Sequence, residues 1–209
     1  MRKNIGRNSV ILDIGANIGF YSSFFSKCTG PGGLVISFEP DKTNFAKLSR
    51  ITKNKKNIQS VNCAVSNSNL DIDLFLSSDL NVDHHTYDDG ESRKSVKVKS
   101  VSIDSFLEQN FPDLMVDFIK MDLQGFDLIA FRGMINTIKK SNKMIILGEC
   151  WPYGLEKANS NMLDYYTELQ KSGFQVNFIP EMKLNDILKK SSDRDFYSNF
   201  IACKNCDAN

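Results

Sequence analysis

The chain has 209 residues, of which 41% are hydrophobic and 24% are charged, and its formal net charge is +1. A chain of this size buries roughly 70% of its unfolded surface as one domain, here residues 1–209, so it needs neither disulfide bonds nor a metal to fold. The small net charge excludes an overall field for nucleic acid or an anionic membrane. No apolar run approaches the roughly 18 residues of a membrane helix. We expect a soluble, cytoplasmic protein that binds neither nucleic acid nor membranes.

Predicted strands and helices alternate along the chain. Short apolar runs predict the strands, and apolar residues on a helical period predict the helices between them. We expect strands at residues 9–14, 34–38, 58–65, 116–121, 144–147, 174–179 and 196–203, and helices at residues 18–27, 41–53, 102–110, 126–139 and 160–172. This alternation is typical of an α/β fold with a doubly wound, mostly parallel sheet, here of about seven strands, and helices on both faces.

Residues 70–99 break this alternation with a small insertion of strands and a loop. Apolar and polar residues alternate around Leu74 and again around Val96, which predicts two half-exposed strands. A polar, acidic loop connects them and carries two adjacent histidines, His84 and His85. This loop could fold over a site as a lid and bring the imidazoles to it, or it could leave both histidines in solvent.

A glycine-rich loop follows the first predicted strand. In the segment VILDIGANIGF the strand ends at Asp13, and glycines follow at Gly15 and Gly19. Ligands of parallel α/β sheets lie beyond the carboxyl ends of the strands, and glycines let the backbone approach a nucleotide closely. The loop lacks the GxGxxG pattern of dinucleotide-binding dehydrogenases, because Asn17 replaces the second glycine, and it lacks the GK[ST] of a P-loop. The sequence therefore disfavours a nicotinamide cofactor and excludes a P-loop.

A second acidic residue, Glu39, follows the second predicted strand. Its carboxylate can accept hydrogen bonds from both hydroxyls of a ribose. Glu39 alone could be an ordinary surface residue at a strand end. Its position one strand after the glycine-rich loop favours ribose binding, and the adenine is then expected past the third strand, near Ala64 and Val65.

The loop resembles the first motif of Rossmann-like S-adenosylmethionine-dependent methyltransferases, written D/E-x-G-x-N/G-x-G. Further segments look like the FkbM family of methyltransferases: FEP at 38–40, SIDSF at 102–106, IKMDLQGFD at 119–127 and RG at 132–133. The resemblance extends over residues 9–149. It implies a Rossmann-like fold, S-adenosylmethionine as the cofactor, and O-methylation of a small-molecule or sugar hydroxyl.

On this resemblance, the cofactor is expected to contact the glycine-rich loop and the neighbouring strand ends. The candidate cofactor-binding residues are Asp13, Gly15, Ala16, Asn17, Gly19, Glu39, Pro40, Ala64, Val65 and Asp122. Asp13 is expected to hold either the loop or the methionine amine.

The chain departs from the family pattern at two positions. Gln124 and Asp127 stand where the family usually has glutamate. Asp127 keeps the charge, whereas Gln124 removes a carboxylate from the cleft and is a poor ligand for a hard cation. We therefore expect no metal.

Methylation of a hydroxyl requires a base near the strand ends. Asp122 ends the strand beside the cofactor loop, Glu149 ends the next strand, and these two residues with His84 and His85 are the candidate catalytic residues. Asp122 could instead cap the following helix. Trp151, just after Glu149, could wall a pocket or lie in the core.

The leading hypothesis is an S-adenosylmethionine-dependent methyltransferase that acts on a small molecule, such as a sugar or glycan. Gln124 leaves open a non-catalytic, cofactor-binding assembly subunit of the same fold. An RNA or protein methyltransferase is disfavoured, because the sequence shows no basic face and no Asn/Asp-Pro-Pro-Tyr/Phe motif. The lone CxxC at Cys203 and Cys206 has no second pair with which to bind zinc.

Overall fold

A computed structural model describes residues 4–76, 86 and 94–206. Its main sheet has seven strands in the order β10-β11-β9-β8-β1-β2-β3. They are β1 (Val10–Ile14), β2 (Leu34–Phe38), β3 (Ile58–Val61), β8 (Phe118–Met121), β9 (Met144–Cys150), β10 (Gln175–Ile179) and β11 (Ser198–Lys204). β11 runs opposite to the other six strands and pairs antiparallel with β9 and β10, whereas all other pairs in this sheet are parallel. The predicted α/β fold with a mostly parallel sheet of about seven strands is confirmed.

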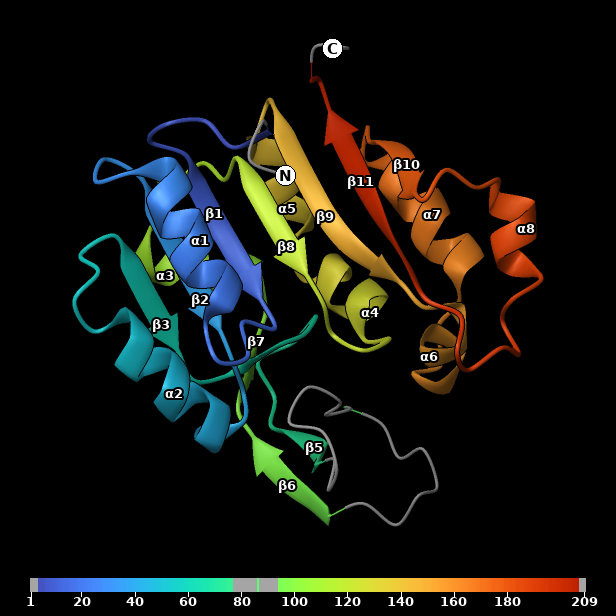
Figure 1. Cartoon of the computed structure of the whole chain (residues 1–209), viewed down its shortest axis with the longest axis horizontal. Coiled ribbons are helices and arrows are strands. Elements are labelled where there is room, and N and C mark those ends of the chain that lie inside the picture. The colour runs from blue at the N-terminus through green and yellow to red at the C-terminus, as the bar shows by residue number, and fades with distance from the viewer. Residues whose placement is uncertain (1–3, 77–85, 87–93, 207–209) are drawn as a thin grey trace.

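Helices cover both faces of this sheet (Figure 1). They are α1 (Phe20–Thr29), α2 (Lys42–Thr52), α3 (Ile103–Asn110), α4 (Asp127–Arg132), α5 (Ile135–Lys140), α6 (Pro152–Lys157), α7 (Met162–Lys171) and α8 (Leu184–Leu188). Alternate residues of β1 point to opposite faces. Ile11 packs with Phe25 of α1, whereas Leu12 packs in a larger cluster with Leu107 of α3 and Ile138 of α5. Two apolar layers therefore hold the sheet.

The predicted insertion forms one small sheet beside the main one, and the residues on either side of it form a second. β5 (Ile72–Leu76) pairs with β6 (Lys94–Val98) as an antiparallel ribbon, and β4 (Ala64–Val65) pairs with β7 (Ser100–Val101) in parallel. The prediction of one strand at 58–65 is therefore wrong. β3 stops at Val61, and the Asn62 side chain then donates hydrogen bonds to the carbonyls of Glu39 and Pro40. The chain turns at this point, and β4 leaves the main sheet.

The predicted helix at 126–139 is also divided, into α4 and α5. A Cβ at Gly133 would overlap the carbonyl oxygen of Ser66, so the chain passes too close to its neighbour for any side chain there. α5 then begins anew, because the Asp104 carboxylate accepts hydrogen bonds from the backbone N–H groups of Asn136 and Thr137. Two segments of the family pattern, SIDSF and RG, thus meet in a structural contact, in which the Asp104 N–H also donates to the Gly133 carbonyl.

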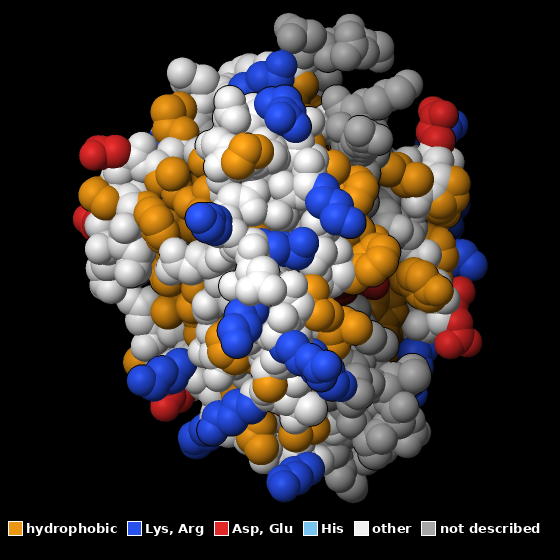
Figure 2. Space-filling model, turned by 60° about the vertical axis from the view of Figure 1, so that its left-hand side comes forward, with side chains coloured by type: hydrophobic (Ala, Val, Ile, Leu, Met, Phe, Trp, Pro, Cys, Tyr) orange, Lys and Arg blue, Asp and Glu red, His pale blue; other side chains and the backbone are white. Residues whose placement is uncertain are grey.

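Charge is distributed unevenly over the surface. Lys and Arg side chains spread over the side of the molecule that carries α1 and α2 (Figure 2). We define the α2 basic surface as the six cations of α2 and the turn after it: Lys42, Lys47, Arg50, Lys53, Lys55 and Lys56. No acidic residue occurs between positions 42 and 70, and none of the six forms an ion pair with a described residue. The net charge of +1 therefore conceals a local excess of positive charge.

None of the helices in the described part of the chain is both long enough and apolar enough to cross a lipid bilayer.

Candidate active site

A cleft of about 430 Å³ opens beyond the carboxyl ends of β1, β2 and β8. This is where parallel α/β sheets bind ligands, and the volume is ordinary for a small-molecule site. Eight of the ten candidate cofactor residues line it: Gly15, Ala16, Asn17, Glu39, Pro40, Ala64, Val65 and Asp122. The cleft thus brings together residues from three strand ends, as the sequence predicts.

Left-handed backbone shapes the loop between β1 and α1. Gly15, Asn17 and Gly19 have φ angles of 75°, 50° and 89°, a region that favours glycine and admits asparagine. A Cβ at Gly15 would overlap the carbonyl oxygen of Asp122, so the loop lies directly against the end of β8. The N–H groups of Gly15 and Ala16 donate to the Phe38 carbonyl at 3.1 and 2.9 Å. The loop is therefore fixed from both neighbouring strands.

Glu39 ties this loop to the start of α2. Its carboxylate accepts the N–H of Asn17 at 2.8 Å through Oε2 and the N–H of Asp41 at 2.9 Å through Oε1. Burial raises the pKa of Glu39 to about 7, against the effect of these two hydrogen bonds. Each carboxylate oxygen has two lone pairs, so each retains one beyond its backbone bond. Those lone pairs suit the hydroxyls of a ribose.

Asp13 and Gly19 belong to the site but do not line the cleft. Asp13 is fully buried, and its Oδ2 accepts the Ser22 hydroxyl at 2.6 Å. Burial raises the pKa of Asp13, and the ammonium of Lys120 lowers it to a smaller extent. Of the two roles expected for Asp13, this position fits holding the loop. Gly19 packs against α2, where a Cβ would lie 2.7 Å from Cδ1 of Leu48.

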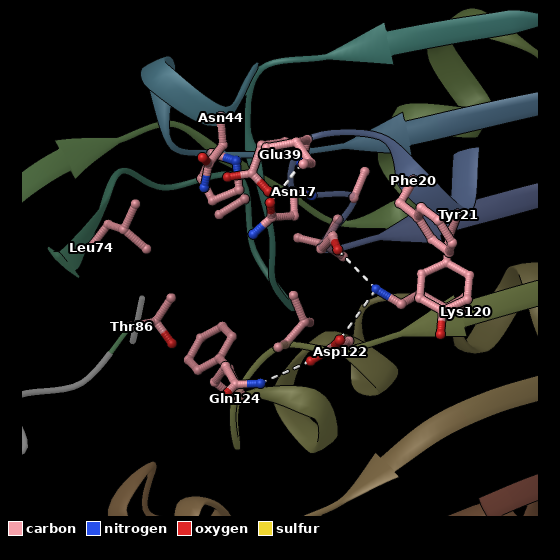
Figure 3. Close-up of a pocket in the computed structure, with 18 residues that line it drawn as sticks. Asn17, Phe20, Tyr21, Glu39, Asn44, Leu74, Thr86, Lys120, Asp122 and Gln124 are labelled. Atoms are coloured by element: carbon pink, nitrogen blue, oxygen red, sulfur yellow. Dashed lines mark hydrogen bonds and ion pairs between the residues drawn. The ribbon is translucent and has the colours of Figure 1, made fainter. Parts of the chain in front are cut away.

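Lys120, in the middle of β8, is a site residue that the sequence reasoning missed. Its ammonium donates to the Gly15 carbonyl at 2.9 Å, lies 3.4 Å from Oδ2 of Asp122 and 3.9 Å from Oδ1 of Asp13, and faces the ring of Tyr21. Figure 3 shows it pointing into the cleft between the loop and Asp122. Burial lowers the pKa of Lys120, but the carboxylates of Asp122 and Asp13 outweigh it and raise the pKa. A lysine inside an apolar strand, FIKM, was the available signal.

Asp122 and Glu149 are joined through Gln124. The Gln124 amide donates to Oδ1 of Asp122 at 2.9 Å and to Oε2 of Glu149 at 3.2 Å. Gln124 therefore bridges the two predicted acids, although Glu149 does not line the cleft. β9 extends to Cys150, three residues beyond the predicted end, so Glu149 lies within the strand. Asp122 does not cap α4, whose N-cap is Phe126 and has no side-chain cap.

Asp127 lies beneath the cleft and does not line it. It is the first residue of α4 and is 2% exposed. Burial raises its pKa to about 7, and the negative charge of Asp122 contributes to the rise. The acid that replaces a family glutamate here is thus a buried support of the QGFD turn.

Other candidates lie away from the described cleft or outside the described residues. His84 and His85 fall outside the described residues. Trp151 does not line the cleft, and its indole N–H donates to the Arg194 carbonyl at 3.0 Å. Gln124, which the sequence placed in the cleft, does line it. Cleft residues that the sequence reasoning missed, besides Lys120, come from the loop end, the start of α1, α2, the insertion and the segment after β8: Ile18, Phe20, Tyr21, Asn44, Leu74, Thr86, Leu123 and Phe126.

The residues present fit S-adenosylmethionine. Gly15 places no side chain between the loop and the end of β8. Glu39 offers two carboxylate lone pairs for ribose, and Ala64, Val65 and Pro40 supply an apolar wall. Lys120 and Asp122 form the opposite end of the cleft (Figure 3). Among the described residues, no three His, Cys, Asp or Glu side chains are grouped as metal ligands.

Solved structures with the same fold include methyltransferases. Methyltransferase FkbM from Methylobacillus flagellatus KT is 16% identical with a TM-score of 0.61, covering 94% of this chain but 43% of that protein, so the present chain spans less than half of its length. An rRNA methylase from Streptococcus thermophilus is 11% identical with a TM-score of 0.53, covering 97% of this chain and 90% of that one.

A third structure, Aeropyrum pernix fibrillarin with natively bound S-adenosyl-L-methionine, is 12% identical with a TM-score of 0.52, covering 96% of this chain and 68% of that one. At these identities the likeness shows the fold alone. No curated protein sequence matches the chain. The methyltransferase FkbM domain model matches residues 13–194, which is most of the chain. The chain therefore belongs to the FkbM methyltransferase domain family.

Proposed function

We propose that this protein is an S-adenosylmethionine-dependent methyltransferase that transfers a methyl group to a hydroxyl of a small molecule, such as a sugar or glycan. The observation that carries the proposal is the cleft itself, in which Glu39 and Asn17 lie on one side and Lys120 and Asp122 on the other (Figure 3). Family membership supports the same activity. We further propose that residues 1–209 act as one Rossmann-like domain and that the protein is cytoplasmic.

The chain's own residues supply binding and proton transfer. S-adenosylmethionine, when bound, supplies an electrophilic methyl group on a sulfonium. Glu39 is placed to orient the ribose, and the apolar residues Leu123 and Phe126 exclude water from the other end of the cleft. Asp122, which is partly exposed there, accepts the proton that the acceptor hydroxyl loses as its oxygen forms the new bond to carbon. Gln124 fixes the orientation of that carboxylate.

Calorimetry tests the cofactor part of this proposal. We expect wild-type protein to bind S-adenosylmethionine and S-adenosylhomocysteine, and Glu39→Ala to bind both more weakly by about 10- to 100-fold, the loss of hydrogen bonds to a charged group. Glu39→Gln is the matched control, because it keeps the shape and one acceptor oxygen. Lack of binding by the wild type at high micromolar ligand would end the proposal.

Product formation tests the acceptor part. Release of S-adenosylhomocysteine would be measured with a panel of monosaccharides, nucleotide-linked sugars and phenols. Turnover with a sugar and its loss in Asp122→Ala, with cofactor binding retained, are the expected results. Cofactor binding without turnover on any acceptor would favour the assembly-subunit alternative, for which Gln124 in place of a family glutamate is the motivating observation.

One observation favours a second candidate, an RNA methyltransferase. The six cations of the α2 basic surface form no ion pair with a described residue and lie beside the cleft, which α2 itself lines through Asn44. Binding of a labelled RNA at two salt concentrations tests it. An affinity that falls steeply with salt, and that falls again in Lys47→Glu/Arg50→Glu, would support RNA as the acceptor. The charge-reversed pair Lys189→Glu/Lys190→Glu, near α8, is the matched control.

A further inference from the structure

We propose that Lys120 is a positioning residue for the amino-acid end of the cofactor. It acts through two groups that it holds in one arrangement: the Gly15 carbonyl of the cofactor loop and the Asp122 carboxylate. This inference rests on the proposed cofactor, but it does not depend on the identity of the acceptor.

The position of Lys120 in the sheet explains why its side chain reaches both groups. In the parallel pairing of β1 and β8, Lys120 is the partner of Asp13, so the two side chains leave the same face of adjacent strands. Only 7% of the Lys120 side chain is exposed. Burial of a cation is unfavourable unless it is paired and hydrogen-bonded, so the ammonium is committed to the partners around it.

Those partners come from three parts of the cofactor site. The ammonium is 2.9 Å from the Gly15 carbonyl oxygen, 3.4 Å from Asp122 and 3.9 Å from Asp13. The ring of Tyr21 in α1 covers it at 5.3 Å. Because the Gly15 N–H is already held by the Phe38 carbonyl, Lys120 fixes the other polar group of the same residue.

Asp122 is fixed in the same way from two sides. Lys120 lies at Oδ2, and the Gln124 amide donates to Oδ1. A continuous chain of contacts thus runs from the loop carbonyl through Lys120, Asp122 and Gln124, as the dashed lines of Figure 3 show.

The position of Glu39 indicates where the amino-acid part of the cofactor lies. Glu39 and Asn17 lie together on one side, whereas Lys120 and Asp122 lie on the other (Figure 3). If Glu39 holds the ribose and the adenine lies near Ala64 and Val65, the amino-acid part of the ligand meets Lys120 and Asp122. Loss of Lys120 should then weaken ligands that possess the amino-acid part and spare those that lack it.

A pair of ligands makes this test. S-adenosylhomocysteine carries the amino-acid group, and 5′-methylthioadenosine keeps the adenosine without it. Removal of Lys120 alone would leave Asp13 as a buried, uncompensated carboxylate and could prevent folding. The comparison is therefore made in a Asp13→Asn background, with Asp13→Asn/Lys120→Met and Asp13→Asn/Lys120→Arg, and thermal unfolding verifies the fold of each variant.

Relative to Asp13→Asn, we expect Lys120→Met to weaken binding of S-adenosylhomocysteine about tenfold, because the Gly15 carbonyl and the Asp122 carboxylate lose the ammonium that holds them in place. Binding of 5′-methylthioadenosine should change less than about twofold. Lys120→Arg should recover part of the loss. An equal loss for both ligands would show that Lys120 only supports the fold, and no loss for either would also overturn the inference. Failure of the wild type to bind S-adenosylhomocysteine would overturn the cofactor proposal, and this inference with it.

Discussion

The two ends of the cleft are built from different parts of the chain. At the Glu39 end, backbone groups form most of the contacts. The N–H groups of Gly15 and Ala16 donate to the Phe38 carbonyl, and those of Asn17 and Asp41 donate to the Glu39 carboxylate. At the Asp122 end, side chains contact side chains, from Lys120 to Asp122, Gln124 and Glu149.

This difference decides what a substitution does. The Glu39 end is built from backbone groups and depends on φ angles and on the absence of side chains, so it does not tolerate a larger residue. The side-chain network of the Asp122 end can exchange one polar group for another and thereby change its chemistry. The Glu39 end is thus suited to a constant part of the ligand, the ribose of the cofactor. The Asp122 end is where a change such as Gln124 for glutamate adjusts the reaction.

The largest effect is expected for Gly15→Ala. Alanine at a φ of 75° is strained, and its Cβ would overlap the Asp122 carbonyl. We expect binding of S-adenosylhomocysteine to weaken by about 1,000-fold, equivalent to about 4 kcal/mol, measured by calorimetry. This substitution tests whether ligand binding depends on the absence of a side chain at Gly15.

Gly173→Ala is the matched control for that prediction. Gly173 also has a positive φ, 91°, but a Cβ there would meet nothing closer than 3.8 Å. It therefore costs the left-handed strain of alanine, about 1–2 kcal/mol, without the overlap and far from the cleft. If Gly15→Ala bound S-adenosylhomocysteine no more weakly than Gly173→Ala, the backbone account of the Glu39 end would be wrong.

The next largest effect is expected for Asp122→Asn. The amide keeps the size of the side chain but cannot accept the acceptor's proton, so turnover should fall by about 100-fold or more, while S-adenosylhomocysteine binding should fall by less than about tenfold. Turnover is measured by product release with the acceptor that the panel identifies. Equal losses in turnover and binding would show that Asp122 acts only through cofactor binding and not as the base.

The same contrast explains what could be predicted from the sequence. Gly15 and Asn17 could be identified from their spacing in the loop. Glu39 could be identified from its position at the end of a predicted strand. Lys120 could not, because its partners Asp13 and Gly15 lie 107 and 105 positions away in the chain and meet it only through the register of β1 and β8. The residue types at 119–127 were informative, but the network they form required the strand pairing.

The elements were predicted well where apolar periodicity is strong and poorly where a tertiary contact interrupts it. Seven strands and the insertion followed from the pattern. The break between β3 and β4, however, depends on the hydrogen bonds of Asn62, and the break at Gly133 depends on the approach of Ser66. No local signal reveals either contact.

A smaller effect is expected for Gln124→Glu. This change replaces the donor between Asp122 and Glu149 with a third carboxylate, and the repulsion among them should lower the melting temperature by a few °C, roughly 1 kcal/mol. Added Mn²⁺ should restore it by binding the three acids. Gln124→Met, measured with and without Mn²⁺, is the matched control and should show no effect of the metal. If Mn²⁺ did not raise the melting temperature of Gln124→Glu either, the account of the Asp122 end as a network of exchangeable side chains would be wrong.

The smallest effect concerns stability alone and compares one buried acid at each end. The pKa values of Glu39 and Asp127 rise to about 7 from 4.5 and 3.8. Between pH 4 and 7 the unfolded carboxyls lose their protons while the folded ones retain them, so the free energy of unfolding decreases as pH rises and the contribution is lost above pH 7.

Asp127→Asn and Glu39→Gln should each make this pH dependence shallower, because a neutral amide has no proton to lose. We expect each variant to gain a few °C over the wild type at pH 8, at roughly 2–4 °C per kcal/mol, relative to its difference at pH 4, measured by thermal unfolding without ligand. Glu39→Gln should gain less than Asp127→Asn, because the pKa of Glu39 rises to about 7 from 4.5, whereas that of Asp127 rises to about 7 from the lower value of 3.8. A larger gain for Glu39→Gln would contradict this order.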